Sequence, residues 1–350
     1  MKILKNILIP GIALCAFLSQ ARAQSTPQAQ TTPSPVDAQH DQAPGTAQTA
    51  VQQPVKPERP KAPAPDMADV KYGPYARNTL DFWKAKSDKP TPLMVHIHGG
   101  GFYSGDKAEL LDLNMLKTCM KLGISLANIN YRFSTDAPFP APMLDGARAI
   151  QYLRLHAAEF NIDPTRIGAS GGSAGAGMSL WIGFHPDLAD PKSEDPVLRQ
   201  SSRLSCMFVG GAQSSYDPRW VKEHIPGHAW EHPAITKLFG FKPEDADTPA
   251  AHKLYEEASA ITFVTKDSPP AFLGYSDQDA IPLTADTTLG AGIHSIQFGW
   301  LLKEKMDALG VECIVFNPAA YAGKPANERP SLEDFLKKNL IGNGNQADKK

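Results

Sequence analysis

Residues 167–175 read IGASGGSAG, and this stretch decides the fold. Its apolar first half predicts a buried strand over residues 167–170, and the residues after the turn predict a helix running to Trp181. Between the two, Ser173 lies on a tight turn whose flanking glycines let neighbouring backbone approach without steric clash. A strand, a turn and a helix in this order project a serine hydroxyl from the edge of a sheet, as a nucleophile requires.

The chain on both sides of this turn alternates between strand-like and helical patterns from about residue 69 onward. Apolar residues spaced three and four apart mark buried helical faces over residues 143–160 and 298–309. Such alternation predicts an α/β fold in which a mainly parallel sheet carries helices on both faces. The expected strands span residues 93–98, 124–132, 167–170, 204–209, 271–275 and 311–316.

One long interval, residues 214–266, breaks this alternation and is rich in Trp, His and Pro. We expect a lid insertion here, within a single domain that covers residues 67–350. Ligands of open parallel sheets bind beyond the carboxyl ends of the strands. An insertion at that edge would therefore shape the substrate cavity.

The N-terminal part has the features of a targeting segment. Lys2 and Lys5 precede an apolar run over residues 7–18, and the sequence ARA at 21–23 places small residues at positions −3 and −1 of a cleavage site. The apolar run is shorter than the roughly 20 residues that a membrane-spanning helix needs. Residues 1–23 therefore predict a secretory signal peptide and export to the periplasm or the extracellular space, without stable membrane insertion.

Residues 24–66 consist mostly of Gln, Thr, Ala and Pro, and the 31 prolines of the 350-residue chain crowd toward this end. With almost no large apolar side chain, this segment cannot bury enough surface to offset its ordering entropy. We interpret it as a disordered tether. The cysteines that remain after cleavage, Cys119, Cys206 and Cys313, are too few for a disulfide framework.

The composition excludes several classes of protein. The chain is 42% hydrophobic and 21% charged, which excludes collagen, a coiled coil and a wholly disordered chain. Its 35 basic and 37 acidic residues form no long run of one sign, and the formal net charge is −2. Nothing therefore predicts a nucleic-acid partner.

A second glycine-rich turn, HGGGF at residues 98–102, directly follows the expected strand 93–98. Its main-chain N–H groups can face a developing oxyanion. Together with the N–H of Ala174, those of Gly100 and Gly101 would complete an oxyanion hole. We expect His98 to orient this loop rather than to act as a base.

These motifs, taken in order, resemble the α/β-hydrolase fold and, within it, the esterases of the hormone-sensitive-lipase and BD-FAE type. The resemblance covers about residues 72–340 and implies hydrolysis of carboxylic esters. The residues that carry it are His98 to Phe102, Ser104-Gly105-Asp106-Lys107, Asn130-Tyr131-Arg132, Pro140 with Asp145, and Gly171 to Gly175.

The family order requires an acid after the expected strand 271–275, and two aspartates compete for this role. Counting forward from Pro269-Pro270 favours Asp279, which we prefer, whereas counting from Gly274 favours Asp277. The family histidine normally follows the last strand, but residues 311–350 contain none. His294 alone preserves the order Ser, Asp, His, so we predict it as the general base.

The expected lid contains three histidines at intervals of four residues, which on a continuous helix would share one face and could bind zinc. Pro226 and Gly227 interrupt any such helix, so we interpret the histidines as polar lid surface and predict no metal and no cofactor. Trp220, Trp230 and Phe239 could line an acyl or sugar pocket or pack in the core. The three histidines are His224, His228 and His232.

The sequence thus predicts an exported serine esterase that cleaves small carboxylic esters through an acyl-enzyme. In this hypothesis Ser173 attacks, His294 takes its proton and Asp279 orients the imidazole. The missing histidine after the last strand supports a different hypothesis, an inactive hydrolase fold that binds a glycan, lipid or protein. An amidase or peptidase would use the same residues. Which ester is cleaved and the oligomeric state stay open.

Overall fold

The computed structural model describes residues 62–108 and 112–342. The predicted signal peptide, residues 1–23, and the predicted tether up to residue 61 lie outside the described residues. Eight strands form one sheet in the order β1-β2-β4-β3-β5-β6-β7-β8. The strands are β1 (Met67–Lys71), β2 (Thr79–Trp83), β3 (Thr91–Ile97), β4 (Ser125–Ile129), β5 (Ile162–Gly172), β6 (Met207–Gly210), β7 (Ala271–Gly274) and β8 (Cys313–Phe316).

The sheet is mainly parallel, as predicted. The β1–β2 and β2–β4 pairs are antiparallel, and the pairs that join β4, β3, β5, β6, β7 and β8 are parallel. Every predicted strand is present, although β4 ends at Ile129 rather than at residue 132 and β5 already begins at Ile162. Six neighbouring strands therefore end at the same edge, where both glycine-rich turns lie.

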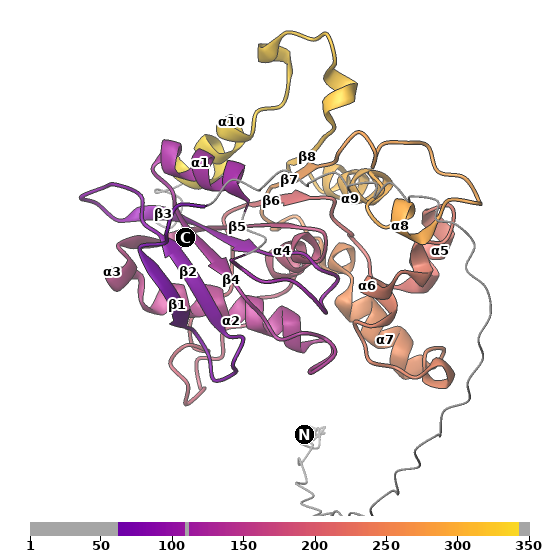
Figure 1. Ribbon diagram of the computed structural model, residues 1–350, viewed down its shortest axis with the longest axis horizontal. Helices are drawn as coiled ribbons and strands as arrows, with labels where there is room; N and C mark the ends of the chain where they lie inside the picture. The colour runs from indigo at the N-terminus through magenta and orange to yellow at the C-terminus, as the bar shows by residue number, and fades with distance from the viewer. Residues whose placement is uncertain (1–61, 109–111, 343–350) are drawn as a thin grey trace, which may run out of the picture. The chain divides into compact units, whose positions relative to one another are not determined.

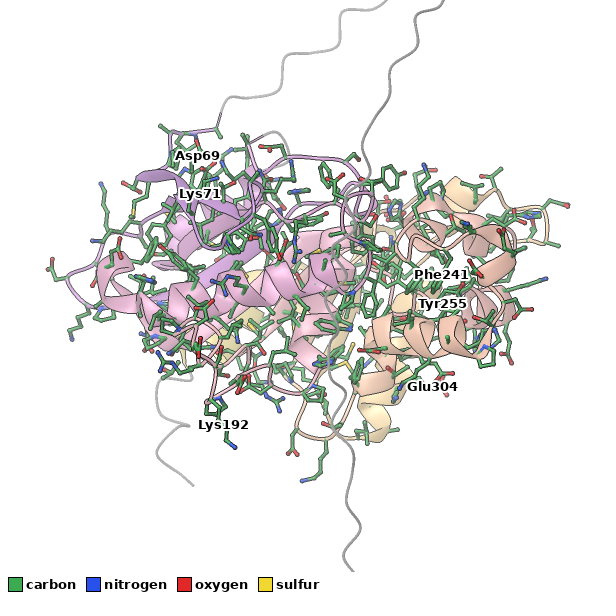
Figure 2. All side chains as sticks on the ribbon, turned by 90° about the horizontal axis from the view of Figure 1, so that it is seen from below. Asp69, Lys71, Lys192, Phe241, Tyr255 and Glu304 are labelled. Atoms are coloured by element: carbon green, nitrogen blue, oxygen red, sulfur yellow. The ribbon has the colours of Figure 1, made fainter. Side chains whose placement is uncertain are left out.

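The sequence analysis missed β1 and β2. β1 lies at one edge of the sheet and pairs on one side only, and it carries Asp69 and Lys71, both labelled in Figure 2. A short edge strand with charged side chains lacks the apolar run that identifies a buried strand. The folded unit also begins before residue 67, because Pro63 O accepts a hydrogen bond from the Trp83 indole at 3.0 Å.

Helices cover both faces of the sheet, and each face has its own apolar cluster. Side chains of α1 and α10 pack on one face, and side chains of α2, α4 and α9 pack on the other. Figure 1 shows α1 and α10 together on one side of the strands and α2 on the opposite side. The bounds are α1 (Leu113–Leu122), α2 (Ala141–Leu155), α3 (Ala157–Phe160), α4 (Ala174–Phe184), α9 (Gln297–Ala308) and α10 (Leu332–Leu336), with the π-helical turn Lys337–Ile341 and the 3₁₀ turns Pro318–Tyr321 and Ala326–Glu328 after β8.

Residues 211–270 connect β6 to β7 and are called the β6–β7 insertion below. They form short helices where the sequence predicted a lid, and α8 (Leu289–Gly292) follows β7 next to them (Figure 1). The elements of the insertion are α5 (Pro218–His224), η1 (Ala229–Glu231), α6 (Pro233–Thr236), η2 (Pro243–Asp245), α7 (Pro249–Ala258) and η3 (Ala260–Phe263).

Aromatic side chains pack the β6–β7 insertion against α4, the helix that follows Ser173. Phe139 lies between Trp181 of α4 and Phe239 of the insertion, with ring centroids 6.3 and 5.8 Å away. Phe241 and Tyr255 extend the cluster and lie close together in Figure 2, with ring centroids 5.8 Å apart. Phe239 therefore has the core-packing role rather than a pocket-lining one. The insertion therefore packs against α4 and is not an unpacked loop above the sheet.

The three cysteines of the described residues are free and buried. Burial raises the pKa of each thiol to about 12. They therefore act as small apolar side chains, and no disulfide joins them. No helix among the described residues combines the length and the apolar character needed to cross a membrane.

Candidate active site

Ser173 lies on a strained turn between β5, which ends at Gly172, and α4, which begins at Ala174. Its φ of 52° and ψ of −119° are values that residues other than glycine rarely adopt. A Cβ added to Gly175 would lie 2.0 Å from the carbonyl oxygen of Ile97, so only glycine fits there. The turn therefore packs directly against the end of β3 and exposes the serine side chain.

His294 meets Ser173 at this turn. It lies between α8 and α9, and its Nε2 is 2.8 Å from Ser173 Oγ. Burial lowers the pKa of His294 below its ordinary value of 6.5, and the nearby charge of Asp279 opposes this shift. The imidazole is therefore neutral at pH 7. With its proton on Nδ1, Nε2 accepts a hydrogen bond from the serine hydroxyl.

Asp277 and Asp279, the two candidates for the catalytic acid, have different surroundings. Asp279 Oδ2 accepts hydrogen bonds from the Ser276 N–H and hydroxyl, both at 2.8 Å. Asp277 Oδ1 instead accepts from the Ala319 N–H at 2.9 Å, beyond the end of β8. Of the two, Asp279 is the one whose charge acts on His294. Among the described residues, however, no carboxylate hydrogen-bonds to the ring of His294.

The second glycine-rich turn lies next to the serine. Gly100, Gly101 and Phe102 have φ values of 105°, 63° and 69°, which fold the loop back on itself. Within the described residues, the N–H groups of Gly100, Gly101 and Ala174 donate to no protein acceptor. Gly100 and Ser173 line one cavity of about 420 Å³. Unpaired main-chain donors next to a serine hydroxyl are the arrangement that stabilises an oxyanion.

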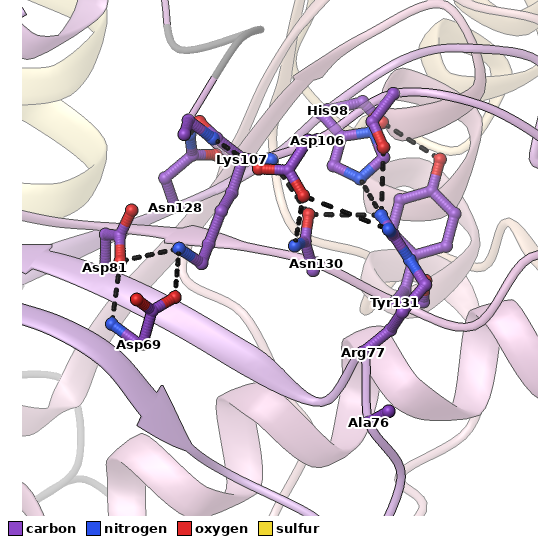
Figure 3. A network of polar contacts seen from close by, with 12 residues as sticks. Asp69, Ala76, Arg77, Asp81, His98, Asp106, Lys107, Asn128, Asn130 and Tyr131 are labelled. Atoms are coloured by element: carbon purple, nitrogen blue, oxygen red, sulfur yellow. Dashed lines mark hydrogen bonds and ion pairs between the residues drawn. The ribbon is translucent and has the colours of Figure 1, made fainter.

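The His98 side chain supports this loop from behind (Figure 3). Its Nδ1 lies 2.7 Å from Gly99 O, its ring stacks on Tyr131 with centroids 4.5 Å apart, and its Nε2 lies 3.4 Å from Arg77. Burial lowers the pKa of His98 to about 4, so the ring stays neutral. Its ring nitrogens contact the loop and Arg77, and it therefore orients the loop.

A larger polar network behind the loop explains why the flanking motifs occur (Figure 3). The Arg77 guanidinium donates to Gly105 O at 2.9 Å, and the Asn130 amide donates to Asp106 at 2.7 Å. Lys107 is buried and forms ion pairs with Asp81 at 2.7 Å and with the exposed Asp69 at 2.8 Å. Sequence reasoning had noted some of these residues only as motif matches and had missed Arg77.

The three lid histidines lie in different elements. His224 ends α5 and stacks on Trp220, with ring centroids 4.3 Å apart, and His228 pairs with Glu231 at 3.2 Å. His232 caps α6 by accepting the Ala234 N–H at Nδ1. Nowhere in residues 62–108 and 112–342 do three metal-ligating side chains gather in a group that could hold an ion.

His232 nevertheless has a feature that the sequence did not reveal. Burial lowers its pKa, and the charge that His294 carries when protonated adds to this shift. The start of α6 therefore lies within electrostatic reach of the histidine that contacts Ser173. The β6–β7 insertion thus borders the site, as an insertion at this edge of a parallel sheet is expected to do.

Comparison with known protein families matches residues 80–289 to the family described as BD-FAE. A curated relative, LipM of Mycobacterium tuberculosis, described as a probable carboxylic ester hydrolase, is 27% identical over 219 residues, which are 61% of this chain and 48% of LipM. The chain spans about half the length of the first curated relatives that it matches.

Solved structures share the fold. An acetyl ester-xyloside bifunctional hydrolase from Caldicellulosiruptor lactoaceticus has a TM-score of 0.61 and 23% identity, over 80% of this chain and 98% of that one. A thermophilic esterase from Thermogutta terrifontis with propionate bound has a TM-score of 0.55 and 21% identity, over 79% and 94%. At such identities the likeness establishes the architecture, which is that of the α/β hydrolases.

Proposed function

Because this chain belongs to the BD-FAE family, we propose that it is a serine hydrolase that cleaves carboxylic esters through an acyl-enzyme. The single observation that supports the proposal most is the 2.8 Å contact between His294 Nε2 and Ser173 Oγ. A serine hydroxyl becomes a nucleophile when a neutral imidazole can take its proton. The lowered pKa of His294 keeps the imidazole in that form at pH 7.

In the proposed reaction, Ser173 Oγ attacks the ester carbonyl while its proton passes to His294 Nε2. The carbonyl oxygen becomes an oxyanion that accepts hydrogen bonds from the N–H groups of Gly100, Gly101 and Ala174. Loss of one such donor typically raises the barrier by about 3 kcal/mol. The tetrahedral intermediate collapses, and the alcohol leaves with the proton from His294.

Water completes the cycle by the same steps in reverse order. His294 accepts a proton from the water, whose oxygen attacks the acyl carbon, and the acid leaves as Ser173 recovers its proton. The carboxylate of Asp279 stabilises the imidazolium that forms in each half-reaction through its charge, in agreement with its effect on the pKa of His294.

Short acyl groups are the substrates we propose. The Thermogutta terrifontis esterase of the same fold holds propionate. Hydrolysis rates for a series of p-nitrophenyl esters should be highest at two to four acyl carbons and fall with longer chains. A maximum at eight or more carbons would contradict this part of the proposal.

The catalytic roles are tested with p-nitrophenyl acetate and a fluorophosphonate probe. Ser173→Ala and His294→Ala should each lower kcat by about 10⁴-fold or more, and neither should be labelled at the wild-type rate. His228→Ala, an exposed histidine of the insertion, is the matched control and should leave kcat unchanged. Full activity of the Ser173→Ala variant would refute the nucleophile, and an unreactive wild type would favour an inactive binding protein.

We also propose that the protein is exported after cleavage behind Ala23. The support is the charged, apolar and small-residue order of residues 1–23. Expression of the full chain with a C-terminal tag, followed by fractionation and mass measurement, should give a secreted or periplasmic product that begins at Gln24. A cytoplasmic product that retains residues 1–23 would contradict export.

A further inference from the structure

The loop that carries His294 lies outside the sheet, so other contacts must hold the imidazole at the nucleophile. Gln213 makes the closest of these contacts from the start of the β6–β7 insertion, three residues after β6 ends. Its side chain is completely buried. Its Nε2 donates to Ile293 O at 2.7 Å and to Gly211 O at 2.9 Å.

The amide of Gln213 can adopt only one orientation here. Both groups next to Nε2 are carbonyl oxygens, which accept hydrogen bonds and cannot donate them. Oε1 faces the hydroxyl of Tyr216, which donates to it at 3.2 Å. A flipped amide would place its oxygen against two carbonyl oxygens. Both N–H groups and the oxygen of Gln213 are therefore used, and the side chain is fixed.

The two carbonyl partners of Gln213 belong to two backbone segments next to the imidazole. Ile293 O belongs to the peptide group that leads directly into His294. The backbone of Gly211 lies next to the ring, because a Cβ added to Gly211 would lie 3.4 Å from His294 Cδ2. Gln213 thus links the backbone at Ile293, which carries the imidazole, to the backbone at Gly211, which lies next to the ring.

Tyr216 extends this connection to the nucleophile. A Cβ added to Gly177 would lie 2.0 Å from the Tyr216 hydroxyl, so this hydroxyl rests on the backbone of α4. The Gly177 N–H in turn donates to Ser173 O at 3.0 Å. A continuous set of buried contacts therefore runs from the first turn of α4 through Tyr216 and Gln213 to His294.

We propose that Gln213 is a positioning residue that holds His294 in reach of Ser173, with Tyr216 fixing the orientation of its amide. This inference rests on the proposed function, in which His294 is the general base. Gln213 does not touch the reacting atoms. Its loss would let the imidazole move by a fraction of an ångström or more, and misplacement by 1 Å can cost about 100-fold in rate.

The test compares Gln213→Met with a matched control, Gln151→Met. Gln151 of α2 is also buried, and its Nε2 donates to the carbonyl oxygens of Leu188 at 3.4 Å and Gln200 at 2.8 Å, away from the site. Both variants remove a buried glutamine amide that bridges two carbonyls. We expect Gln213→Met to lower kcat for p-nitrophenyl acetate by about 10- to 100-fold with little change in KM. Gln151→Met should keep the wild-type kcat at a similar loss of thermal stability.

A double variant separates positioning from a general structural role. In the His294→Ala background the residual activity should not fall further when Gln213→Met is added, because there is no imidazole left to hold. An equal loss in both backgrounds, or a wild-type kcat for Gln213→Met, would overturn the inference. If His294→Ala itself keeps full activity, the proposed function fails instead.

Tyr216→Phe provides a second variant that keeps the buried ring and removes only the hydrogen bond to Gln213 Oε1. We expect kcat to fall by about 3- to 10-fold, in line with the loss of one hydrogen bond, and the loss should vanish in the Gln213→Met background. Tyr216→Phe also tests the inference if the Gln213→Met variant does not fold. In that case, an unchanged kcat for Tyr216→Phe would overturn the inference.

Discussion

His294 Nε2 lies 2.8 Å from Ser173 Oγ, although 121 residues separate them in the chain. Ser173 comes from the turn between β5 and α4, and His294 from the connection between β7 and α9. The resemblance to esterases of this type implies a histidine after the last strand, but residues 311–350 contain none. The imidazole at the serine is thus supplied one connection earlier in the chain.

The pH dependence of the reaction should follow the protonation of His294. Burial lowers its pKa below 6.5, and a general base acts only when it is neutral. We expect kcat/KM for p-nitrophenyl acetate to be constant near pH 7 and to fall with decreasing pH, with an apparent pKa below 6.5. A profile that already falls between pH 8 and pH 7 would contradict this assignment.

Asp279 should influence this profile and Asp277 should not. The charge of Asp279 raises the pKa of His294, so Asp279→Asn should move the acid limb of kcat/KM to lower pH. Because no carboxylate among the described residues bonds to the ring, we expect kcat to fall by about 10- to 100-fold, less than the roughly 10⁴-fold loss where the acid bonds directly to the histidine.

The control for this prediction is Asp277→Asn. Asp277 accepts a hydrogen bond from the Ala319 N–H beyond the end of β8, and its charge is not among those that shift the pKa of His294. Its substitution should leave the acid limb in place. A shift of the limb in Asp277→Asn, with none in Asp279→Asn, would reverse the assignment of the acid.

Gly175 should tolerate no side chain. A Cβ there would lie 2.0 Å from Ile97 O, and the backbone of β3 cannot yield without disturbing the sheet. We expect Gly175→Ala to lower the free energy of unfolding by about 3 kcal/mol, the upper end for overpacking. Gly172→Ala is the matched control, since a Cβ there meets no atom within 4 Å. Urea denaturation of both variants measures the difference.

Removal of the buried cation behind the oxyanion loop should destabilise the protein. Lys107→Met would leave the carboxylate of Asp81, which is 8% exposed, without its cationic partner. Breaking a buried pair on one side costs about 3–5 kcal/mol. The double variant with Asp81→Asn should recover part of this loss, which urea denaturation would measure. Lys121→Met, at a surface pair with Glu333, should cost less than about 1 kcal/mol.

The architecture was readable from the sequence in the parallel part of the sheet, where all six strands had been predicted. Residues 93–97 of β3 and 167–170 of β5 are buried and mostly apolar, and they appeared where predicted because strands buried on both faces need such runs. β1 was missed because an edge strand carries charged residues such as Asp69 and Lys71. The charged and polar network around Lys107 was also hidden, because its partners come from three separate strands or loops.

The residue types alone determined the two glycine-rich turns. The positive φ values of Gly100 and Gly101 and the close backbone contact at Gly175 are local requirements that glycine meets without strain, so the pattern of residues records them directly. Whether an imidazole reaches Ser173, which aspartate acts on it and which buried amide holds it depend on packing between segments far apart in the chain. Nothing in the surroundings of Gln213 in sequence distinguishes it from a surface glutamine. Only the tertiary structure, by bringing β6, α4 and the loop before α9 together, decided that it lies behind His294.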